Sequence, residues 1–216
     1  MLGIPLVAMA LVGFGMTSAE RLFLNAFHDA GAVAIFAAAY VLARQPIDMV
    51  GNAINVGAFP EVMSRFDEQG AAATGAFLSQ IMALLTQLCL PVAAMLVALD
   101  EPITELLLPE SYHGRVGLLF PVIAFSVLCA NLTSFVYGIV IHAHKRPWLL
   151  IIATLLGSIA TIALSLLLIP QQAELGAALA LAGGSVVALA ACAVISERLT
   201  PMAIPWRDIA VSLITS

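Results

Sequence analysis

A stripe of polar side chains interrupts one of the long apolar segments, which runs from about residue 33 to residue 59. Arg44, Asp48, Asn52 and Asn55 stand at i, i+4, i+8 and i+11, so on a helix they lie close to one face. Arg44 is about eleven residues into the segment, roughly 16 Å at helical rise, which is near the centre of a bilayer. An unpaired charge at that depth costs at least about 3 kcal/mol, so the stripe must face protein or water. Two interpretations stay open: an Arg44–Asp48 ion pair that neutralises itself, or a stripe that lines a solvated cavity.

Two other apolar segments also carry polar residues at helical spacing. Gln80 and Gln87 are seven residues apart, and Asn131, Ser134 and Tyr137 follow one another at intervals of three. Membrane helices use such side chains as interhelical hydrogen bonds, and the same side chains also line polar cavities. We therefore keep Gln80, Gln87 and Asn131 as candidate binding residues beside the first stripe.

The elements that position these residues are expected to be membrane helices. The 216 residues are 62% hydrophobic and 10% charged, with a mean hydropathy of +1.07, whereas soluble domains are about a quarter charged. Six apolar segments are long enough to cross about 30 Å of hydrocarbon: 2–19, 33–59, 77–99, 118–141, 149–169 and 175–195. The fold predicted is all-α, a polytopic membrane helix bundle of about six transmembrane helices. It forms one lobe over residues 1–200, followed by an interfacial tail or truncated helix at 201–216, and residues 61–73 form a polar connector along the cytoplasmic surface.

Charge sets the expected orientation and excludes some classes of protein. With helices alternating in direction, Arg65, Lys145, Arg146, Arg198 and Arg207 fall on one side, which the positive-inside rule places in the cytoplasm together with both termini. The net charge of −5 and the absence of a long basic cluster argue against nucleic acid as a partner. Three widely spaced cysteines within apolar segments predict neither a disulfide framework nor a metal site.

Small residues four apart predict close helix packing on the last two segments, in the rows Ala153–Gly157 and Gly176–Ala180–Gly184. Catalytic chemistry has little support. Asp100 and Glu101 are adjacent, and side chains at i and i+1 point apart on a helix. No nucleotide-binding loop or nucleophile motif is present. We expect a protein that is not an enzyme, with no catalytic residue, no metal and no cofactor.

Short motifs follow one another along almost the whole chain. They are Glu20-Arg21-Leu22-Phe23-Leu24 after the first segment, AVAIFAAAY at the start of residues 32–60, LLLPESY at residues 106–112, and Ile169-Pro170 followed by Gly176-Ala177-Ala178. In this order they resemble motifs of the polysaccharide biosynthesis proteins, the lipid-linked oligosaccharide (O-antigen, Wzx-like) flippases of the MOP superfamily. Glu20 stands where that family usually has Asp, which keeps the charge. The resemblance covers only the second of the family's two six-helix lobes.

The resemblance implies one lobe of a MATE-like two-lobe transporter in the bacterial inner membrane. Such a transporter moves a polyprenyl-pyrophosphate-linked oligosaccharide to the periplasmic leaflet by alternating access. Arg44 would bind the pyrophosphate, because its planar guanidinium matches phosphate oxygens and stays charged. Sugar hydroxyls would suit Asn52, Asn55, Gln80 and Gln87. The implied partners are the lipid-linked oligosaccharide, membrane lipid and a missing N-terminal lobe or partner polypeptide, the chain being a fragment, a split gene product or a degraded one.

Two other functions compete with this interpretation. The first is a cation-coupled multidrug or metabolite exporter of the same superfamily, in which Asp48 would be the ion or proton site and Arg44 its modulator. The second is a membrane enzyme of glycan assembly, which would use the acidic pairs Asp67–Glu68 and Asp100–Glu101. Dependence of transport on an ion gradient would favour the exporter, and loss of transfer activity on mutating the acidic pairs would favour the enzyme.

Overall fold

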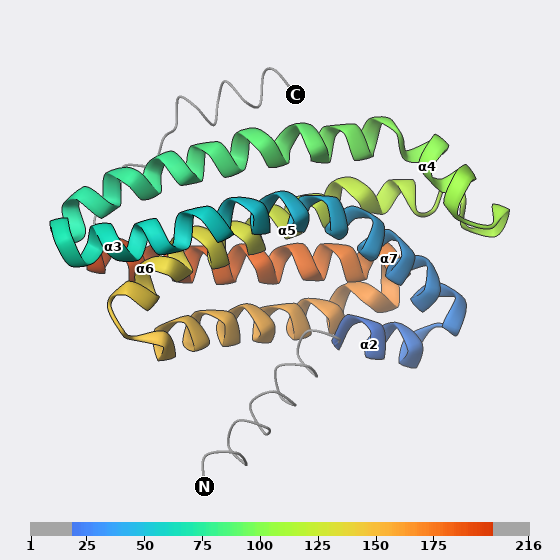
Figure 1. The fold of residues 1–216 in the computed structure, drawn as a ribbon. Helices are drawn as coiled ribbons and strands as arrows, with labels where there is room; N and C mark the ends of the chain where they lie inside the picture. Colours follow the sequence, from blue (N-terminus) through green and yellow to red (C-terminus); the bar gives the residue numbers. More distant parts are fainter. Residues whose placement is uncertain (1–18, 201–216) are drawn as a thin grey trace, which may run out of the picture.

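The structure is a computed structural model that describes residues 19–200, and all of its regular elements in that range are helical. In chain order they are α2 (Ala19–Phe27), α3 (Ala30–Ala98), α4 (Asp100–Leu107), the 3-10 turns η1 (Glu110–Tyr112) and η2 (Gly117–Leu119), α5 (Phe120–Leu132), the π-helical turn η3 (Thr133–Tyr137), α6 (Gly138–Ala143) and α7 (Pro147–Leu199). They form an elongated helix bundle (Figure 1). The all-α expectation is confirmed.

α3 is a helical hairpin rather than one straight rod. Gly70 has φ 79° and ψ −178°, a conformation that glycine adopts far more easily than other residues, and the helix reverses there. The resulting limbs, 30–69 and 71–98, pack side by side. The Cys89 Sγ lies 4.0 Å from the Ile47 carbonyl oxygen across the hairpin. We call these limbs the first and second limbs of α3.

α7 has the same construction, with the reversal at Ala173, where φ is 47° and ψ is −120°. Its limbs are residues 147–172 and 174–199. They approach so closely that a Cβ on Gly184 would lie 2.7 Å from the Gly157 carbonyl oxygen. Small residues therefore allow the two limbs of α7 to pack backbone against backbone, as the rows of small residues predict.

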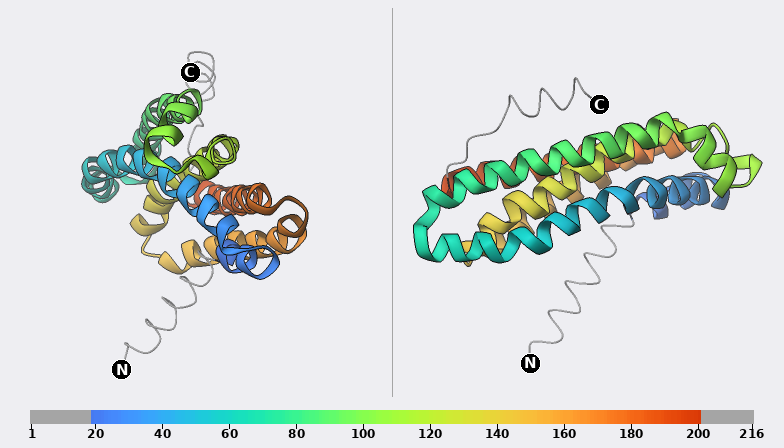
Figure 2. Two further views of the ribbon diagram at one scale, coloured as in Figure 1. Left: turned by 90° about the vertical axis from the view of Figure 1, so that its right-hand side faces the viewer. Right: turned by 45° about the horizontal axis from the view of Figure 1, so that its top comes forward.

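The helix made of α5, η3 and α6 runs parallel to the second limb of α7. Ser126 and Ser185 join their hydroxyls at 2.9 Å, and the Ser196 hydroxyl donates to the Tyr137 carbonyl at 3.2 Å. Both contacts join residues 59 apart in the chain, and a constant separation is the mark of parallel helices. These two helices form the centre of the bundle, seen end-on in Figure 2.

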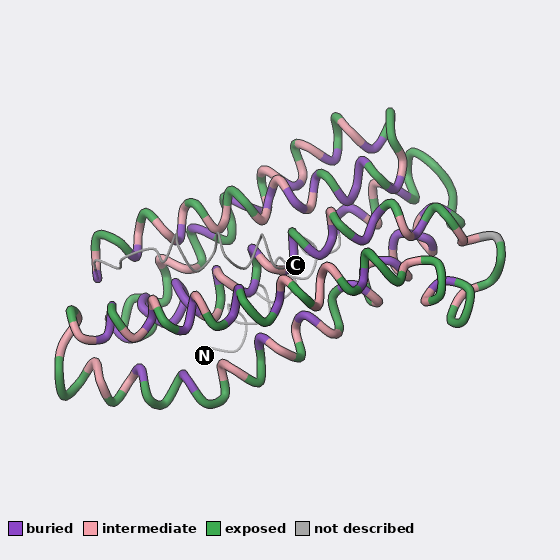
Figure 3. Tube along the Cα trace, turned by 90° about the horizontal axis from the view of Figure 1, so that it is seen from above, coloured by how far each residue is buried: buried purple, intermediate pink, exposed green. Residues whose placement is uncertain are grey.

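The first limb of α3 lies against the other side of α5 and η3. Asn131 donates from Nδ2 to the Ile47 carbonyl at 3.4 Å. One turn further on, Gly51 faces the Phe135 ring, which a Cβ on Gly51 would meet at 2.8 Å. The hydrophobic core is continuous along this contact and includes the fully buried Phe36 and Phe120. Figure 3 shows buried segments on the inner faces of the helices and exposed ones on the outer faces.

The two ends of the bundle carry different charges. One end, which we call the basic end, holds the turn at Gly70 and the exposed Lys145 and Arg146. There the Phe66 ring meets His144 edge-on, with 4.8 Å between ring centroids. The basic residues of this end are balanced by acidic ones such as Asp67 and Glu68, whereas the opposite end is acidic, with Asp100, Glu101, Glu105 and Glu110. α4, η1 and the turn at Ala173 lie at the opposite end (Figure 1). Which end faces the cytoplasm stays a prediction of the positive-inside rule.

Three helices among the described residues are long and apolar enough to span a membrane by length and composition: Ala30–Ala98, Gly117–Ala143 and Pro147–Leu199. This count differs from the expected six because two of the three helices are hairpins. Their limbs and the central helix cover the predicted spans 33–59, 77–99, 118–141, 149–169 and 175–195. The predicted span 2–19 lies almost wholly outside the described residues, and the predicted tail at 201–216 lies outside them too.

Residues 61–73, expected as a polar connector, are helical on both sides of the reversal that joins the two limbs, and their place along the cytoplasmic surface stays a prediction. The helix continues through these residues to the reversal at Gly70. Pairs at i and i+4 satisfy the polar side chains on the helix itself: Arg65 Nε bonds to Glu61 at 2.7 Å, and the Ser64 hydroxyl donates to Glu68 at 2.8 Å. Such pairs stabilise a helix, so polarity here does not interrupt it.

Candidate functional site

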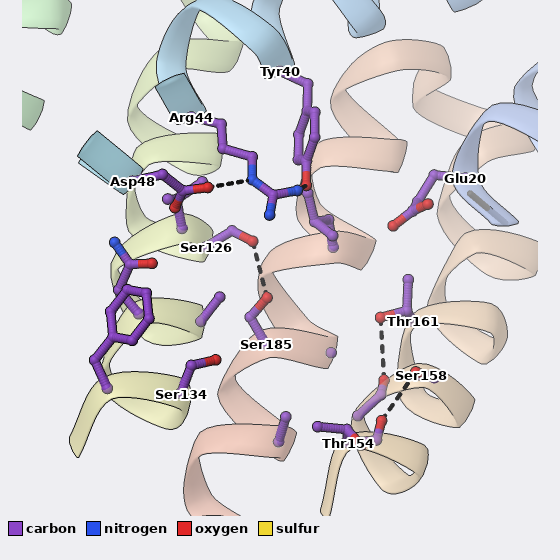
Figure 4. A pocket seen from close by; sticks show the side chains of 18 of the residues that line it. Glu20, Tyr40, Arg44, Asp48, Ser126, Ser134, Thr154, Ser158, Thr161 and Ser185 are labelled. Carbon is purple, nitrogen blue, oxygen red and sulfur yellow. Dashed lines mark hydrogen bonds and ion pairs between the residues drawn. The ribbon is translucent and has the colours of Figure 1, made fainter. Parts of the chain in front are cut away.

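A polar cavity of about 400 Å³ opens on one side of the bundle, within the range of about 300–1,000 Å³ that is usual for ligand sites. The first limb of α3 forms one wall, and the first limb of α7 with the start of α2 forms the other. α5, η3 and the second limb of α7 form the floor between them (Figure 4). The polar lining residues are Glu20, Tyr40, Arg44, Asp48, Asn52, Ser126, Asn131, Ser134, Thr154, Ser158, Thr161 and Ser185.

The α3 wall is built from residues four apart, which a helix places on one face. Arg44 donates from Nε to Asp48 Oδ2 at 2.6 Å and from Nη1 to the Tyr40 hydroxyl at 2.5 Å. Asn52 continues the row and donates to the Asp48 carbonyl at 2.8 Å. The two bonds of Arg44 use two of the five guanidinium N–H groups, and its side chain is 51% exposed. The guanidinium is thus held in place and still has donors to offer a ligand.

The structure therefore combines the two interpretations that the sequence left open for Arg44. The ion pair with Asp48 forms, and both residues also line the cavity. Side chains at i and i+4 meet on any helix, so the pair itself follows from local geometry. Its position beside a polar cavity follows from how α3 packs against α5.

The α7 wall carries a row of hydroxyls. Thr154 donates to the carbonyls of Leu150 and Ile151 at 3.0 Å each, Ser158 donates to the Thr154 carbonyl at 2.9 Å, and Thr161 donates to the Gly157 carbonyl at 3.1 Å. Each hydroxyl thus bonds to a backbone carbonyl one turn earlier in its own helix, which is common for Ser and Thr. The hydroxyl oxygens keep their lone pairs for the cavity.

The floor joins the two walls. The Ser126–Ser185 pair lies between them in Figure 4, and Asn131 is buried and bonded to the α3 backbone. The π-helical turn η3 begins just after Asn131 and places Ser134 at the cavity. The extra residue in a π-turn changes the spacing, and Tyr137 is not among the residues that line the cavity, whereas Asn131 and Ser134 are.

Glu20 is the acidic residue of the α7 side. It lies in the first turn of α2, its residue is 3% exposed, and its carboxylate reaches the cavity margin (Figure 4). In the sequence, Glu20 follows directly after the first apolar segment. The structure buries it beside the polar cavity, where α2 packs on α7.

The structure brings together some of the predicted binding residues and separates others. Arg44, Asp48, Asn52 and Asn131 line the cavity. Asn55, Gln80 and Gln87 are not among its lining residues. Gln80 and Gln87 are exposed on the second limb of α3, which does not form a wall of the cavity.

Sequence reasoning missed Tyr40, Glu20 and the hydroxyl row. Tyr40 stands four residues before Arg44, and Thr154, Ser158 and Thr161 stand at i, i+4 and i+7. These intervals predict that the residues of each set share one face of a helix. Nothing in the α7 segment alone, however, shows that the hydroxyls face Arg44 rather than lipid.

Cysteine and metal chemistry find no support in the described part of the chain. Cys89, Cys129 and Cys192 are free and buried. Within residues 19–200 there is no group of three or more His, Cys, Asp or Glu side chains that could hold a metal ion.

A protein-family model described as "Lipid II flippase MurJ" matches residues 5–215, which is nearly the whole chain. The chain belongs to the MurJ lipid II flippase family. Neither a curated protein nor a solved structure matches it. MurJ membership supports a flippase of a lipid-linked precursor within the MOP superfamily, as the motifs indicate, but it does not support the O-antigen family specifically. MurJ flippases are transporters rather than catalysts, which agrees with a protein that is not an enzyme.

Proposed function

We propose that this chain forms one lobe of a transporter that moves a polyprenyl-pyrophosphate-linked sugar across the bacterial inner membrane, with the polar cavity holding the headgroup. The observation that carries the proposal is a half-exposed guanidinium in a polar cavity between apolar helices. Family membership supports a lipid-linked cargo. The name of the family makes lipid II the first substrate to test.

Arg44 is the group proposed to bind the pyrophosphate. A guanidinium forms paired, charge-assisted hydrogen bonds with phosphate oxygens and stays charged at any working pH. Asp48 and Tyr40 hold it from one side through Nε and Nη1. An anchored guanidinium loses less side-chain entropy on binding than a free one. The Arg44–Asp48 pair therefore supports binding rather than competing with it.

The same contacts weigh against Asp48 as a free cation site in an exporter. Its Oδ2 accepts from Arg44 Nε at 2.6 Å, so a cation there would have to approach a positive neighbour.

We propose that a second lobe covers the exposed side of Arg44 and completes a closed path for the headgroup. The basic end of the bundle faces the cytoplasm in this proposal, with both termini on that side.

The test compares Arg44→Lys, Arg44→Leu, Asp48→Asn and the double variant Arg44→Leu/Asp48→Leu. Inverted membrane vesicles from producing cells keep any partner lobe in place. The measurements are chain abundance and the translocation rate of a fluorescent polyprenyl-pyrophosphate-linked sugar. Charge-assisted hydrogen bonds contribute about 1.5–3 kcal/mol, so Arg44→Leu is expected to slow translocation by about 10- to 150-fold at normal abundance. Arg44→Lys is expected to fall between it and the native chain.

Arg65→Leu is the matched control, because Arg65 also pairs with an acidic residue four positions away, at 2.7 Å, but outside the cavity. It is expected to leave translocation unchanged. Normal translocation by an abundant Arg44→Leu/Asp48→Leu double variant would contradict the proposal that Arg44 binds the pyrophosphate, because that variant has no guanidinium at this position. Low abundance of both single variants, restored in the double, would instead make the pair purely structural.

A further inference from the structure

We infer that the hydroxyl row of α7, formed by Thr154, Ser158 and Thr161, is a sugar-binding wall, in which the accessible Thr154 and Ser158 accept hydrogen bonds from hydroxyl and amide N–H groups of the transported headgroup. The inference rests on the proposed function and adds to it the orientation of the headgroup. The phosphates lie toward Arg44 on the α3 wall, and the sugar lies toward α7.

The hydroxyl row presents acceptors. A hydroxyl has one donor and two acceptor lone pairs, and here each hydrogen is directed to a carbonyl of the same helix. The α3 wall differs, because the guanidinium of Arg44 on it has only donors, beside the Asp48 carboxylate that holds it. The two walls are thus chemically different, and a ligand with an anionic part and a part rich in hydroxyl donors complements both.

The packing contacts place the row opposite Arg44 at the same depth. A Cβ on Gly184 would meet the Thr161 hydroxyl, so Thr161 is level with Gly184 and its neighbour Ser185. Ser185 bonds to Ser126 on the floor. Asn131, five residues beyond Ser126, bonds to Ile47, so Ser126 is level with residues 40–44 of α3.

The row then runs along the cavity toward the basic end. Thr154 stands seven residues before Thr161, or about 10 Å along the helix axis. Its level is therefore near Asp48 and Asn52, on the opposite wall. Figure 4 shows Thr154, Ser158 and Thr161 together on one side and Tyr40, Arg44 and Asp48 on the other.

Interhelical bonding does not account for the row. Elsewhere in the bundle hydroxyls do join helices: Ser126 bonds to Ser185, and Ser196 donates to the Tyr137 carbonyl. Thr154, Ser158 and Thr161 bond only within α7. Thr154 is exposed and Ser158 half-buried, so their hydroxyls face the open cavity, whereas Thr161 is buried at the end of the row, with its hydroxyl against Gly184.

The experiment measures binding of two probes to the purified full-length chain in detergent, by microscale thermophoresis. One probe is farnesyl pyrophosphate, and the other is farnesyl-pyrophosphoryl-N-acetylglucosamine, which adds one sugar. The variant is Thr154→Val/Ser158→Ala, which removes two hydroxyls and nearly preserves their shape. Ser158→Ala alone is the second variant, should the double variant unfold at a lower temperature. Thr86→Val is the control, because Thr86 also bonds within its own helix, to the Met82 carbonyl, and lies outside the cavity.

The double variant is expected to lose about five- to thirtyfold in affinity for the sugar probe, with Ser158→Ala alone losing part of it. Affinity for farnesyl pyrophosphate stays within twofold, and Thr86→Val changes neither. A double variant that binds the sugar probe as tightly as the native chain would overturn the sugar-binding wall, as would a native chain for which the sugar adds no affinity. Neither result affects the Arg44 proposal. A native chain that binds neither probe would overturn the proposed function itself.

Discussion

Replacing Gly184 by Ala tests the close packing of the two limbs of α7, on which the shape of the cavity depends. The added Cβ would lie 2.7 Å from the Gly157 carbonyl oxygen and would overlap the Thr161 hydroxyl. The Thr161 side chain can rotate, but the Gly157 carbonyl is backbone. A relaxed C···O contact needs about 3.3 Å, so the limbs must separate by roughly 0.6 Å.

The magnitude is best isolated by comparison with Gly57→Ala. Gly57 also lies inside a helix, and a Cβ there would have no atom within 4 Å. Ala is favoured over Gly in a helix by about 0.5–1 kcal/mol, and this gain is common to both variants. Overpacking costs about 1–3 kcal/mol, so the two variants should differ by that amount.

Thermal unfolding of the purified variants in detergent is the assay. Gly57→Ala is expected to raise the unfolding midpoint slightly, and Gly184→Ala to fall below it by roughly 2–12 °C, at about 2–4 °C per kcal/mol for a chain of this size. Adding Thr161→Ala to Gly184→Ala should recover part of the loss and leave the part due to Gly157. A Gly184→Ala chain as stable as Gly57→Ala would refute the close approach of the limbs.

Two further predictions follow from the turns and the ends of the bundle. Ala173→Gly should raise the free energy of unfolding by about 1 kcal/mol, because Ala173 has φ 47°, a strained value for any residue with a Cβ. The control Ala160→Gly, inside a helical limb, should lower the free energy of unfolding. An Ala173→Gly chain less stable than the native chain would contradict the turn geometry. Cysteines introduced at the exposed Lys145 and Glu105 should react with an impermeant maleimide from opposite sides of the membrane, Lys145 from the cytoplasmic side, and labelling of both from one side would contradict the orientation.

Features that depend on helical period were predictable from the sequence. Arg44 and Asp48 meet because i and i+4 share a helix face, whatever surrounds them. Gly157 and Gly184 pack closely because small residues four apart leave a groove that another helix can enter. The same period was available for Thr154, Ser158 and Thr161, and reading it would have found the second wall of the cavity.

Features that interrupt the period were not predictable in the same way. The π-turn η3 moves Tyr137 away from the face of Ser134, and the interval of three residues that suggested a shared face does not hold across it. Glu61 and Arg65 looked like a connector because they are charged, yet the helix continues through them and they pair on one of its faces. Composition reports which residues tolerate water, and it does not report where a helix ends.

The sequence alone determined that this is an apolar, all-helical chain with a charged stripe inside one of its helices, since length, hydropathy and helical period are local properties. Only the tertiary structure decided which stripes share a space. Arg44 and Thr161 are 117 positions apart in the printed sequence and face one cavity. They do so because the first limb of α3 packs on α5, while the reversal at Ala173 lays the first limb of α7 against its second limb beside α5. Such contacts depend on the packing of all the helices at once, which no single segment records.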